Sequence, residues 1–463
     1  MSGQLTRRAM LSRLGLGGTA ASMSLLAGRG FADADTDGDP SYPGFAKNIR
    51  KVAPSMQDVP SARIEGGKVI QPARELPVFH TTDVVVVGGG SAGFAAAVAA
   101  ARTGAKVALV ERYGSLGGLF TNGMVLIVIG TGVKEGGAFK LVTRGICEEF
   151  LRRLEKMGPG AITKLTDTVG QPTADPEAAK VLMDEMIQEA GVEMFFHAWG
   201  VDVIQNGNAV QGVVFESKQG RQAILAKVVV DASGDGDVYF QAGAGYQQIS
   251  HAMGFVYRVG NADRVDKTKL PKGTKPPRLG SAEPIPSARW MNNLGPKGNG
   301  LDIRELSKIE MMHRKSAWNY VQKIRGTPGH EEVFLMQTTP QIGVRATRLL
   351  DGVTSIDKKS AAAQTKFPDV VAVSGHDGLR LPEFQIPYGA LLPKTVDNVI
   401  AAGRCIACGA DLIDRVRLIP VCIVTGHAAG VAAALAAQAG VRPRDVPAAD
   451  IQKVLRGQGA YLG

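Results

Sequence analysis

Cysteine and aromatic residues are scarce in this chain. Only four of the 463 residues are cysteine, which is too few for a scaffold held together by disulfides. Cys405 and Cys408 form a C-x-x-C pair without a second pair, so we interpret them as small core residues in preference to a redox pair or a metal site. Aromatic residues make up 6% of the chain and do not alternate with a basic stretch, so nothing indicates nucleic-acid binding.

Histidine clusters and uninterrupted apolar runs are also missing. The seven histidines form neither a Ser-His-Asp arrangement nor a set of metal ligands, so no metal site is expected. Two apolar stretches, 84–101 and 419–439, approach the length of a membrane span. Both contain glycine clusters, and the second contains Pro420 and His427, so we assign both to the interior of a folded domain.

Glycine and hydrophobic residues are abundant instead. The 58 glycines exceed the usual share of about 7% and cluster in turns beside apolar runs, where backbone approaches a ligand. Hydrophobic residues make up 44% and charged residues 21%, which indicates a large core and two or three domains. The net charge is +10. The first 34 residues hold four arginines and one aspartate, and the +7 beyond them mildly favours anionic partners.

The N-terminus has the order of an export signal. Arg7 and Arg8 precede a weakly apolar run over 14–27, and small residues end it at Ala34. The Thr-Arg-Arg-x-Met-Leu order resembles a twin-arginine signal, which we prefer to a frayed basic terminus. We therefore predict a signal peptide over 1–34, cleaved near Ala34, export to the periplasm by the twin-arginine translocase, and a linker and entry arm over 35–80.

The next segment, 84–111, has the pattern of a strand, a glycine-rich turn, a helix and a second strand, in that order. The β-branched run 84–87 predicts a buried parallel strand, 95–102 a helix and 106–110 a second strand. Gly88, Gly90 and Gly93 fit G-x-G-x-x-G between them, where they permit a tight turn, close approach of a pyrophosphate and close helix packing. Glu111 ends the second strand, where a carboxylate can accept hydrogen bonds from ribose hydroxyls. This unit predicts a dinucleotide site.

The remaining pattern divides the chain into two interleaved parts. We predict helices over 139–157, 176–190, 302–325 and 420–439, and strands near 193–197, 201–204, 210–216, 223–230 and 399–402. The lysine- and proline-rich stretch 261–300 is predicted to be a mobile loop. The domains are expected to be 81–244 and 396–463 for dinucleotide binding, with 245–395 inserted as a substrate or cap domain.

Five motifs give this chain a specific resemblance. They are "ERYGSLGG" at 111–118, "VDASGDGD" at 230–237, "QIGVRATR" at 341–348, "IPYGALLP" at 386–393 and the segment 398–435 that begins "NVIAAGRCI". From about residue 70 to the C-terminus the chain resembles the FAD-dependent oxidoreductase family. The resemblance implies an α/β fold with a Rossmann-like FAD-binding domain, similar to glutathione reductase and fumarate reductase, and an inserted α+β cap domain.

The resemblance also implies which residues contact FAD. Adenosine would lie at Gly88–Gly93 and Glu111, the pyrophosphate and flavin near Gly117 and Gly118, and adenine near the backbone of Val201. Ser233 would line the dinucleotide, and the start of the helix at 420–439 would stabilise reduced flavin. The full set of implied cofactor residues is Gly88, Gly90, Ser91, Gly93, Glu111, Arg112, Gly117, Gly118, Val201, Ser233, Gly234, Asp235, Gly403, Arg404, Leu418 and Ile419.

The chain departs from its apparent relatives at four positions near the expected pocket. Many relatives have a small residue at the positions of Asp414 and Arg415. They have Glu at the position of Ala346 and Gln at the position of His427. These departures alter the pocket edge, so no substrate is carried over from the family.

Five residues are candidates for catalysis. Arg345 and Arg417 fall in family motifs, and either could clamp a carboxylate or form a structural ion pair. His376 could act as a base, Tyr388 lies on the approach to the flavin segment, and His251 is a weaker candidate.

The function that these features predict is an exported FAD-dependent dehydrogenase or oxidase. It would oxidise a small organic substrate, either anionic or neutral, by hydride transfer to flavin N5 and pass electrons to a quinone, a cytochrome or oxygen. The alternatives are a flavin-dependent reductase of an activated double bond and an electron-transfer subunit without its own substrate. The size of the 245–395 region favours an enzyme with a substrate.

Overall fold

The computed structural model describes residues 61–135, 138–165, 171–375 and 382–463, so the predicted signal lies outside the described residues. The chain divides into two units, Met1–Arg74 and Glu75–Gly463. In the first unit the described part is a short antiparallel hairpin of β1 (Arg63–Glu65) and β2 (Lys68–Ile70). Everything below concerns the second unit.

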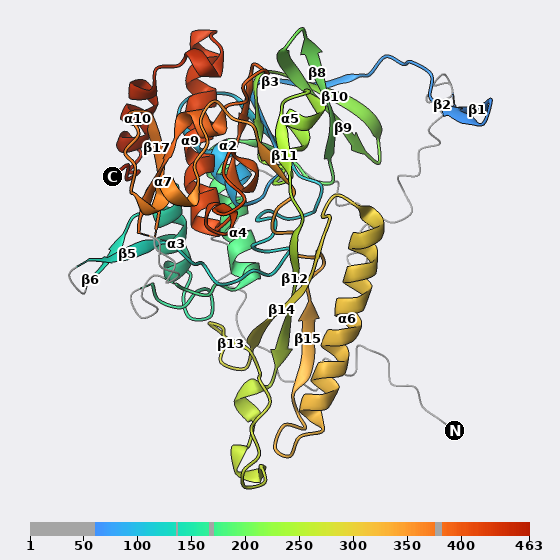
Figure 1. Cartoon of the computed structure of the whole chain (residues 1–463), viewed down its shortest axis with the longest axis vertical. Helices are drawn as coiled ribbons and strands as arrows, with labels where there is room; N and C mark the ends of the chain where they lie inside the picture. Colours follow the sequence, from blue (N-terminus) through green and yellow to red (C-terminus); the bar gives the residue numbers. More distant parts are fainter. Residues whose placement is uncertain (1–60, 136–137, 166–170, 376–381) are drawn as a thin grey trace, which may run out of the picture. The chain divides into compact units, whose positions relative to one another are not determined.

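A mixed sheet forms the centre of the second unit (Figure 1). Val84–Val87 are at most 4% exposed, as a β-branched run buried on both faces requires. β10 changes partners along its length, because its first half pairs antiparallel with β9 and its last residues pair parallel with β19. The strands in spatial order are β7 (Glu193–Phe195), β4 (Val107–Val110), β3 (Val78–Val87), β10 (Gly220–Asp231), β9 (Ala209–Ser217) and β8 (Trp199–Asn206), with β19 (Val399–Ala401) beside β10.

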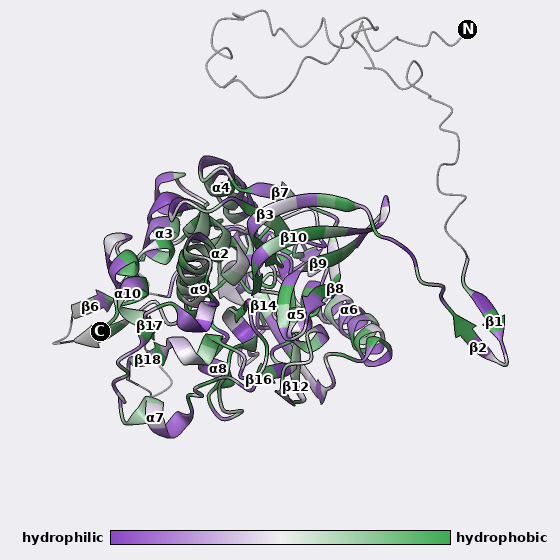
Figure 2. Ribbon diagram, turned by 90° about the horizontal axis from the view of Figure 1, so that it is seen from above, coloured by the Kyte–Doolittle hydropathy of each residue, from purple (hydrophilic) through white to green (hydrophobic). Residues whose placement is uncertain are grey.

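Two small-residue helices, α2 (Ser91–Arg102) and α9 (Ile419–Ala439), lie side by side in the middle of this body (Figure 2). A Cβ atom on Gly426 would lie 2.0 Å from the carbonyl oxygen of Ala92, so the backbones are in direct contact there. Among the described residues, α9 is the one helix long and apolar enough to cross a membrane, and 89% of its most apolar window is buried inside the protein. That burial is typical of a core helix.

Particular residues set the starts of the helices α4 and α3 on the flank. α4 (Pro176–Glu189) starts after Asp175, whose side chain accepts hydrogen bonds from two first-turn amides. α3 (Ile146–Lys156) is shorter than the predicted helix 139–157, because β6 (Ala138–Leu141) pairs with β5 (Gly132–Glu135) and Gly145, at φ +70°, starts the helix. The remaining helical elements are α5 (Asp237–Gln241), α7 (Lys358–Ala362), α8 (Ile413–Val416), α10 (Ala448–Gly457), η3 (Tyr388–Leu391), η4 (Gly403–Cys405) and η5 (Pro443–Asp445).

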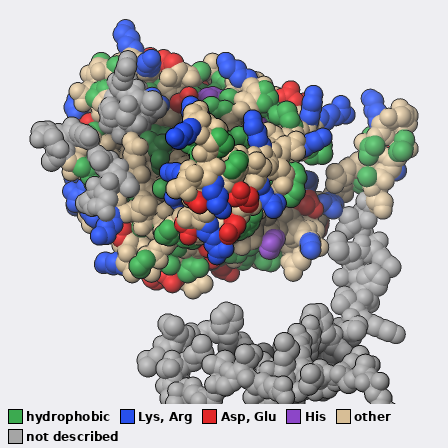
Figure 3. All heavy atoms as spheres, turned by 90° about the horizontal axis from the view of Figure 1, so that it is seen from below, with side chains coloured by type: hydrophobic (Ala, Val, Ile, Leu, Met, Phe, Trp, Pro, Cys, Tyr) green, Lys and Arg blue, Asp and Glu red, His purple; other side chains and the backbone are tan. Residues whose placement is uncertain are grey.

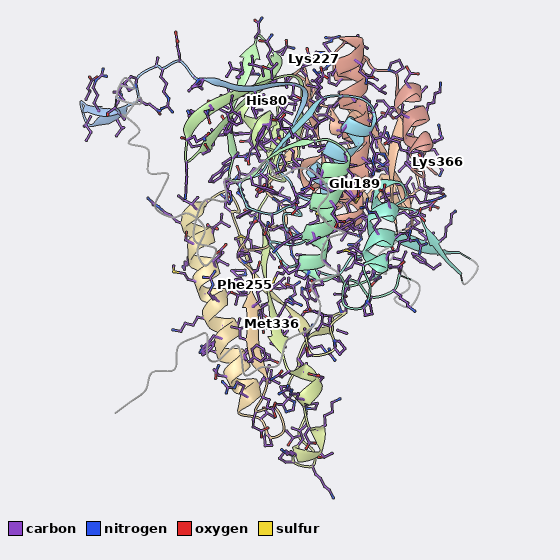
Figure 4. The ribbon with its side chains drawn as sticks, turned by 180° about the vertical axis from the view of Figure 1, so that it is seen from behind. His80, Glu189, Lys227, Phe255, Met336 and Lys366 are labelled. Carbon is purple, nitrogen blue, oxygen red and sulfur yellow. The ribbon has the colours of Figure 1, made fainter. Side chains whose placement is uncertain are left out.

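A second layer, here called the cap (residues 251–342), extends away from the α/β body (Figures 1 and 4). The long helix α6 packs on one face of its sheet, and Phe255, labelled in Figure 4, belongs to the core between them. On the face shown in Figure 3 basic and acidic side chains are interspersed. Within the cap, Arg264 and Glu332 form an ion pair at 2.9 Å. The cap elements are β12 (His251–Gly260), η1 (Ala262–Arg264), η2 (Lys267–Lys269), β13 (Ser281–Ala282), β14 (Arg289–Gly298), α6 (Ile303–Arg325) and β15 (Phe334–Thr338).

The structure corrects two predictions about this region. The predicted loop 261–300 contains β14, which lies inside the cap sheet in the order β13-β14-β12-β15. Pro296 argued against a strand here, because proline cannot donate a backbone hydrogen bond. It is tolerated because the short β13 pairs only with the start of β14, so no strand flanks Pro296 on that side.

The predicted end of the inserted domain at 395 is also too late. Residues from Ala346 onward belong to the core of the α/β body, as do β17 (Val370–Ser374) and β18 (Phe384–Pro387) beside α9. β16 (Arg348–Leu350) pairs with β11 (Tyr246–Gln248), which closes the insertion.

Candidate functional site

A cleft of about 950 Å³ opens where β3 turns into α2, here called the first cleft. Gly88 has φ +96°, and a Cβ atom there would lie 2.6 Å from the carbonyl oxygen of Ala232. Gly117 donates its amide to the Gly89 carbonyl at 2.8 Å, and a Cβ atom on Gly118 would lie 2.9 Å from the Cα of Gly90. The floor of the cleft is therefore bare backbone at the start of a helix, where free amides favour an anion.

One end of the first cleft is acidic and aromatic. Glu111 is 5% exposed, and its carboxylate accepts amide hydrogen bonds from Gly89 at 2.6 Å and Tyr113 at 2.9 Å. Burial raises the pKa of Glu111 above its usual value, and the two amide hydrogen bonds oppose that rise. Arg112 stacks over Tyr113 and over Trp199, at 4.8 Å and 5.5 Å from the ring centroids. These groups can hold a polar ring system with hydroxyl groups.

The wall opposite is an acidic turn held by arginines. Arg404 donates to the Gly234 carbonyl and to the Asp235 carboxylate, both at 2.6 Å, so Asp235 faces this guanidinium and does not line the cleft. Asp237 lines the cleft in its place, and Arg348 donates to its carboxylate at 2.9 Å. Burial, together with neighbouring carboxylates, raises the pKa of Asp237 to about 6.

A second cleft of about 1200 Å³ lies beside the first and between the α/β body and the cap. The two clefts share Leu119, Arg404, Arg417 and Ile419, so they are continuous. Ile419 is the first residue of α9, whose N-terminal end therefore faces the junction. The second cleft is mostly apolar, and its apolar walls are Leu119, Val125, Ile127, Ile129, Val256, Trp290, Val344, Leu418 and Ile419.

Polar side chains gather at one end of the second cleft. Arg417 donates from Nε and Nη2 to the same oxygen of Asp414, at 2.9 Å and 2.7 Å, and His251 Nε2 lies 3.4 Å from that oxygen. Burial alone would raise the pKa of Asp414, but Arg417, His251 and Arg345 outweigh it and lower that pKa. Burial and the nearby Arg417 lower the pKa of Arg345, which forms no hydrogen bond or ion pair with the described residues.

Most of the residues predicted for the cofactor line the first cleft, and five do not. Gly93 faces the Gly88 carbonyl, and Gly403 donates its amide to Thr425 at 3.1 Å. Val201 lies beyond Trp199 and Gly200, which line the cleft instead, and Leu418 lines the second cleft. The predicted residues in the first cleft are Gly88, Gly90, Ser91, Glu111, Arg112, Gly117, Gly118, Ser233, Gly234, Arg404 and Ile419.

The candidates for catalysis separate more sharply. Arg345 and Arg417 line the second cleft together. Tyr388 lines neither cleft, because it is buried and its hydroxyl donates to the Pro443 carbonyl at 2.8 Å, so its prediction as a catalytic residue is corrected to a structural role. His376 lies outside the described residues. His251 reaches the site through Asp414.

Two further positions behave differently from their sequence interpretation. His427 is buried in the core against Gln458 at 2.7 Å, and burial lowers its pKa to about 4, so it is a neutral core residue. Asn292 lines the second cleft with a buried, unpartnered Oδ1, and it was missed because its segment was interpreted as a loop. The four cysteines are buried and free. No group of His, Cys, Asp and Glu in the described part of the chain could hold a metal ion.

The fold and the glycine-lined first cleft define a dinucleotide-binding oxidoreductase of the Rossmann-like α/β type. The chain belongs to the FAD dependent oxidoreductase family, whose model matches residues 83–252 and 248–455. It is thus an FAD-dependent oxidoreductase and FAD is its cofactor.

Comparisons with individual proteins add one short sequence match and likenesses of the fold. A dihydrolipoyl dehydrogenase of Trypanosoma brucei brucei is 53% identical over 49 residues, which is 11% of this chain and 10% of that enzyme. A geranylgeranyl bacteriochlorophyll reductase-like protein from Thermoplasma acidophilum is 16% identical over 81% of this chain and 83% of its own, with a TM-score of 0.41. The flavin-dependent brominase Bmp2 is 15% identical over 82% and 84%, with a TM-score of 0.44.

The residues of the first cleft fit FAD. α2 has no side-chain cap on its first-turn amides, and the glycine floor leaves the space that side chains would fill, as a pyrophosphate requires. Glu111 stands at the end of β4, where it can accept hydrogen bonds from ribose. The cleft continues past Arg404 to the start of α9, which leaves the flavin end beside the second cleft.

Proposed function

We propose that this enzyme is a dehydrogenase or oxidase that removes a hydride from a small organic molecule held in the second cleft. The observation that carries the proposal is the junction of the two clefts at Leu119, Arg404, Arg417 and Ile419. An electron-transfer subunit without its own substrate has no use for a second, largely apolar cleft that opens on its cofactor site. When bound, FAD supplies an acceptor for two electrons.

The chain's own residues would do three things in this reaction. The apolar walls exclude water from the substrate. The N-terminal end of α9 places a partial positive charge at the junction, where negative charge develops on reduction of the cofactor. Asp414 fixes Arg417 and His251 at the polar end of the cleft, because one of its oxygens accepts two hydrogen bonds from Arg417 and lies 3.4 Å from His251 Nε2.

The test is a screen of the purified, FAD-loaded protein under argon. Small alcohols, amines and organic acids are mixed with it one at a time, and bleaching of the flavin absorbance is followed. Bleaching by one class supports oxidation. A reductase would instead stay yellow with all of them, and after chemical reduction it would be reoxidised by activated alkenes, which would overturn the proposed direction.

We also propose that the enzyme is exported to the periplasm by the twin-arginine route, with a quinone, a cytochrome or oxygen as its electron acceptor. Arg7 and Arg8 support the route. The first cleft, which fits FAD, is lined by segments from Gly88 to Ile419, so loading would need the complete chain before export. Changing both arginines to lysine should leave flavin-loaded protein inside the cell with its signal uncleaved. A version with a signal for unfolded export that arrives yellow and active would refute this reason.

A further inference from the structure

At the polar end of the second cleft, one cationic side chain has no anionic partner and one hydrogen-bond acceptor has no donor. Arg345 forms no hydrogen bond or ion pair with the described residues, and Asn292 Oδ1 is buried without a donor. Both face the open side of Gly254 on β12, since a Cβ atom on Gly254 would lie 3.1 Å from Asn292 Oδ1 and 3.8 Å from Arg345 Nη2. A cation and a hydrogen-bond acceptor thus border one small space.

From this juxtaposition we propose that the enzyme recognises a 2-hydroxy carboxylate with an apolar body. Arg345, assisted by Arg417, binds the carboxylate, and Asn292 Oδ1 accepts a hydrogen bond from the hydroxyl on the adjacent carbon. The proposal rests on the proposed function, because it names the substrate class of the same cleft.

The charge balance of the cleft selects an anion. Arg345, Arg404, Arg415 and Arg417 line it, against the single carboxylate of Asp414. Arg404 and Arg417 are already engaged with carboxylates, whereas the partly buried Arg345 is not. A planar guanidinium favours a carboxylate because two parallel N–H donors match its two oxygens.

Asn292 selects the group beside the carboxylate. An acceptor that is buried without a donor is costly, and a ligand hydroxyl or ammonium could supply the missing donor. The arginines that line the same cleft disfavour an ammonium, so a hydroxyl is the better partner. The side chains of Ile127, Ile129, Val256 and Trp290 then surround the rest of the molecule, which must be apolar.

Binding of a ligand that cannot be oxidised tests the recognition separately from the reaction. The probe is 2-hydroxy-2,4-dimethylpentanoate, whose C2 carries no hydrogen, added to the FAD-loaded protein while the flavin absorbance is titrated. The acid should perturb the spectrum with saturation. Its methyl ester and 2,4-dimethylpentanoate, which lacks the hydroxyl, should each bind at least about tenfold more weakly.

Three variants assign the contacts. Arg345→Gln should weaken binding of the acid at least about tenfold. Asn292→Ala should make the acids with and without the hydroxyl bind alike. Gly254→Ala should weaken both by placing a methyl group in the shared space. Arg304→Gln, on the exposed start of α6, is the matched control and should change nothing.

The proposal is overturned if the ester binds as well as the acid, if Asn292→Ala keeps the preference for the hydroxyl, or if the corresponding 2-amino acid binds more tightly. Its failure is distinguishable from failure of the proposed function. Flavin bleaching by a neutral alcohol or an amine, without binding of the acid probe, would leave the oxidase intact and remove only the 2-hydroxy carboxylate.

Discussion

Replacing Glu111 separates its two roles, in folding and in cofactor binding. Its carboxylate accepts two amide hydrogen bonds while 5% exposed, so Glu111→Ala leaves the amides of Gly89 and Tyr113 without an acceptor. Each orphaned donor should cost about 1–3 kcal/mol of stability, less where water enters the space. Loss of a charge-assisted hydrogen bond to ribose should cost a further ~1.5–3 kcal/mol of FAD binding, or roughly ten- to a hundredfold in Kd.

The assay is FAD titration of the stripped protein by flavin fluorescence, with thermal unfolding measured at zero and saturating FAD. Glu111→Gln is the matched control, since its carbonyl oxygen keeps one amide hydrogen bond while its charge is lost. The FAD-dependent rise in Tm should shrink in both variants, because the stabilisation by a ligand grows with the logarithm of its affinity for the native state. An unchanged Kd for FAD in Glu111→Ala would refute the placement of ribose at this carboxylate.

Three further outcomes are expected. Arg417→Ala should retain FAD but lose substrate turnover. Arg417→Lys should restore little turnover, because an ammonium lacks the parallel N–H donors of a planar guanidinium. A wild-type kcat/KM in both variants would show that Arg417 has only a structural role. The pKa of Asp237 is raised to about 6 from 3.8, so the native state binds more protons than the unfolded chain in that range and stability falls as pH rises from about 4 to about 6. Asp237→Asn should remove this dependence of the free energy of unfolding on pH, which urea unfolding at several pH values would measure. It should stabilise the FAD-free protein at pH 7 by at most ~1 kcal/mol, because the Asp237 side chain is 37% exposed. Gly426→Ala should cost about 1–3 kcal/mol through its clash with Ala92. Gly457→Ala, at the end of α10 with open space around it, should not destabilise the protein in the same urea assay.

The parts of the site that follow one another in the chain could be predicted from the sequence. β3, the glycine turn, α2 and β4 are local, and their hydrophobic period and glycine spacing specify them directly. Glu111 follows from the same register. The helices α4, α6 and α9 were also predicted to within two residues, because caps and breakers mark their ends.

The parts that depend on distant contacts could not be predicted. Asp414 lies beside His251 although 163 positions of sequence separate them, and the sequence around neither residue indicates this contact. Asn292 was missed because the lysine- and proline-rich stretch 261–300 was interpreted as a loop, although β12 pairs with Asn292 along the strand. Tyr388 belongs to a family motif, yet its hydroxyl donates a hydrogen bond to the carbonyl of Pro443. Only the tertiary fold shows that these two residues are in contact. Local pattern thus specifies the cofactor site better than the substrate site.

The helix α9 links the stability of the fold to the chemistry of the junction. Its contact with α2 at Gly426 fixes the helix against the dinucleotide-binding unit, and Ile419, seven residues earlier and so about 10 Å along the axis, borders both clefts. Arg417 stands just before α9 and lines the same junction. A shift of the helix caused by a methyl group at Gly426 must therefore move the groups that face cofactor and substrate together. We expect Gly426→Ala to lower the affinity for FAD and the affinity for the 2-hydroxy acid probe together. A destabilised variant that binds the acid as tightly as the wild type would show that α9 deforms only near Gly426.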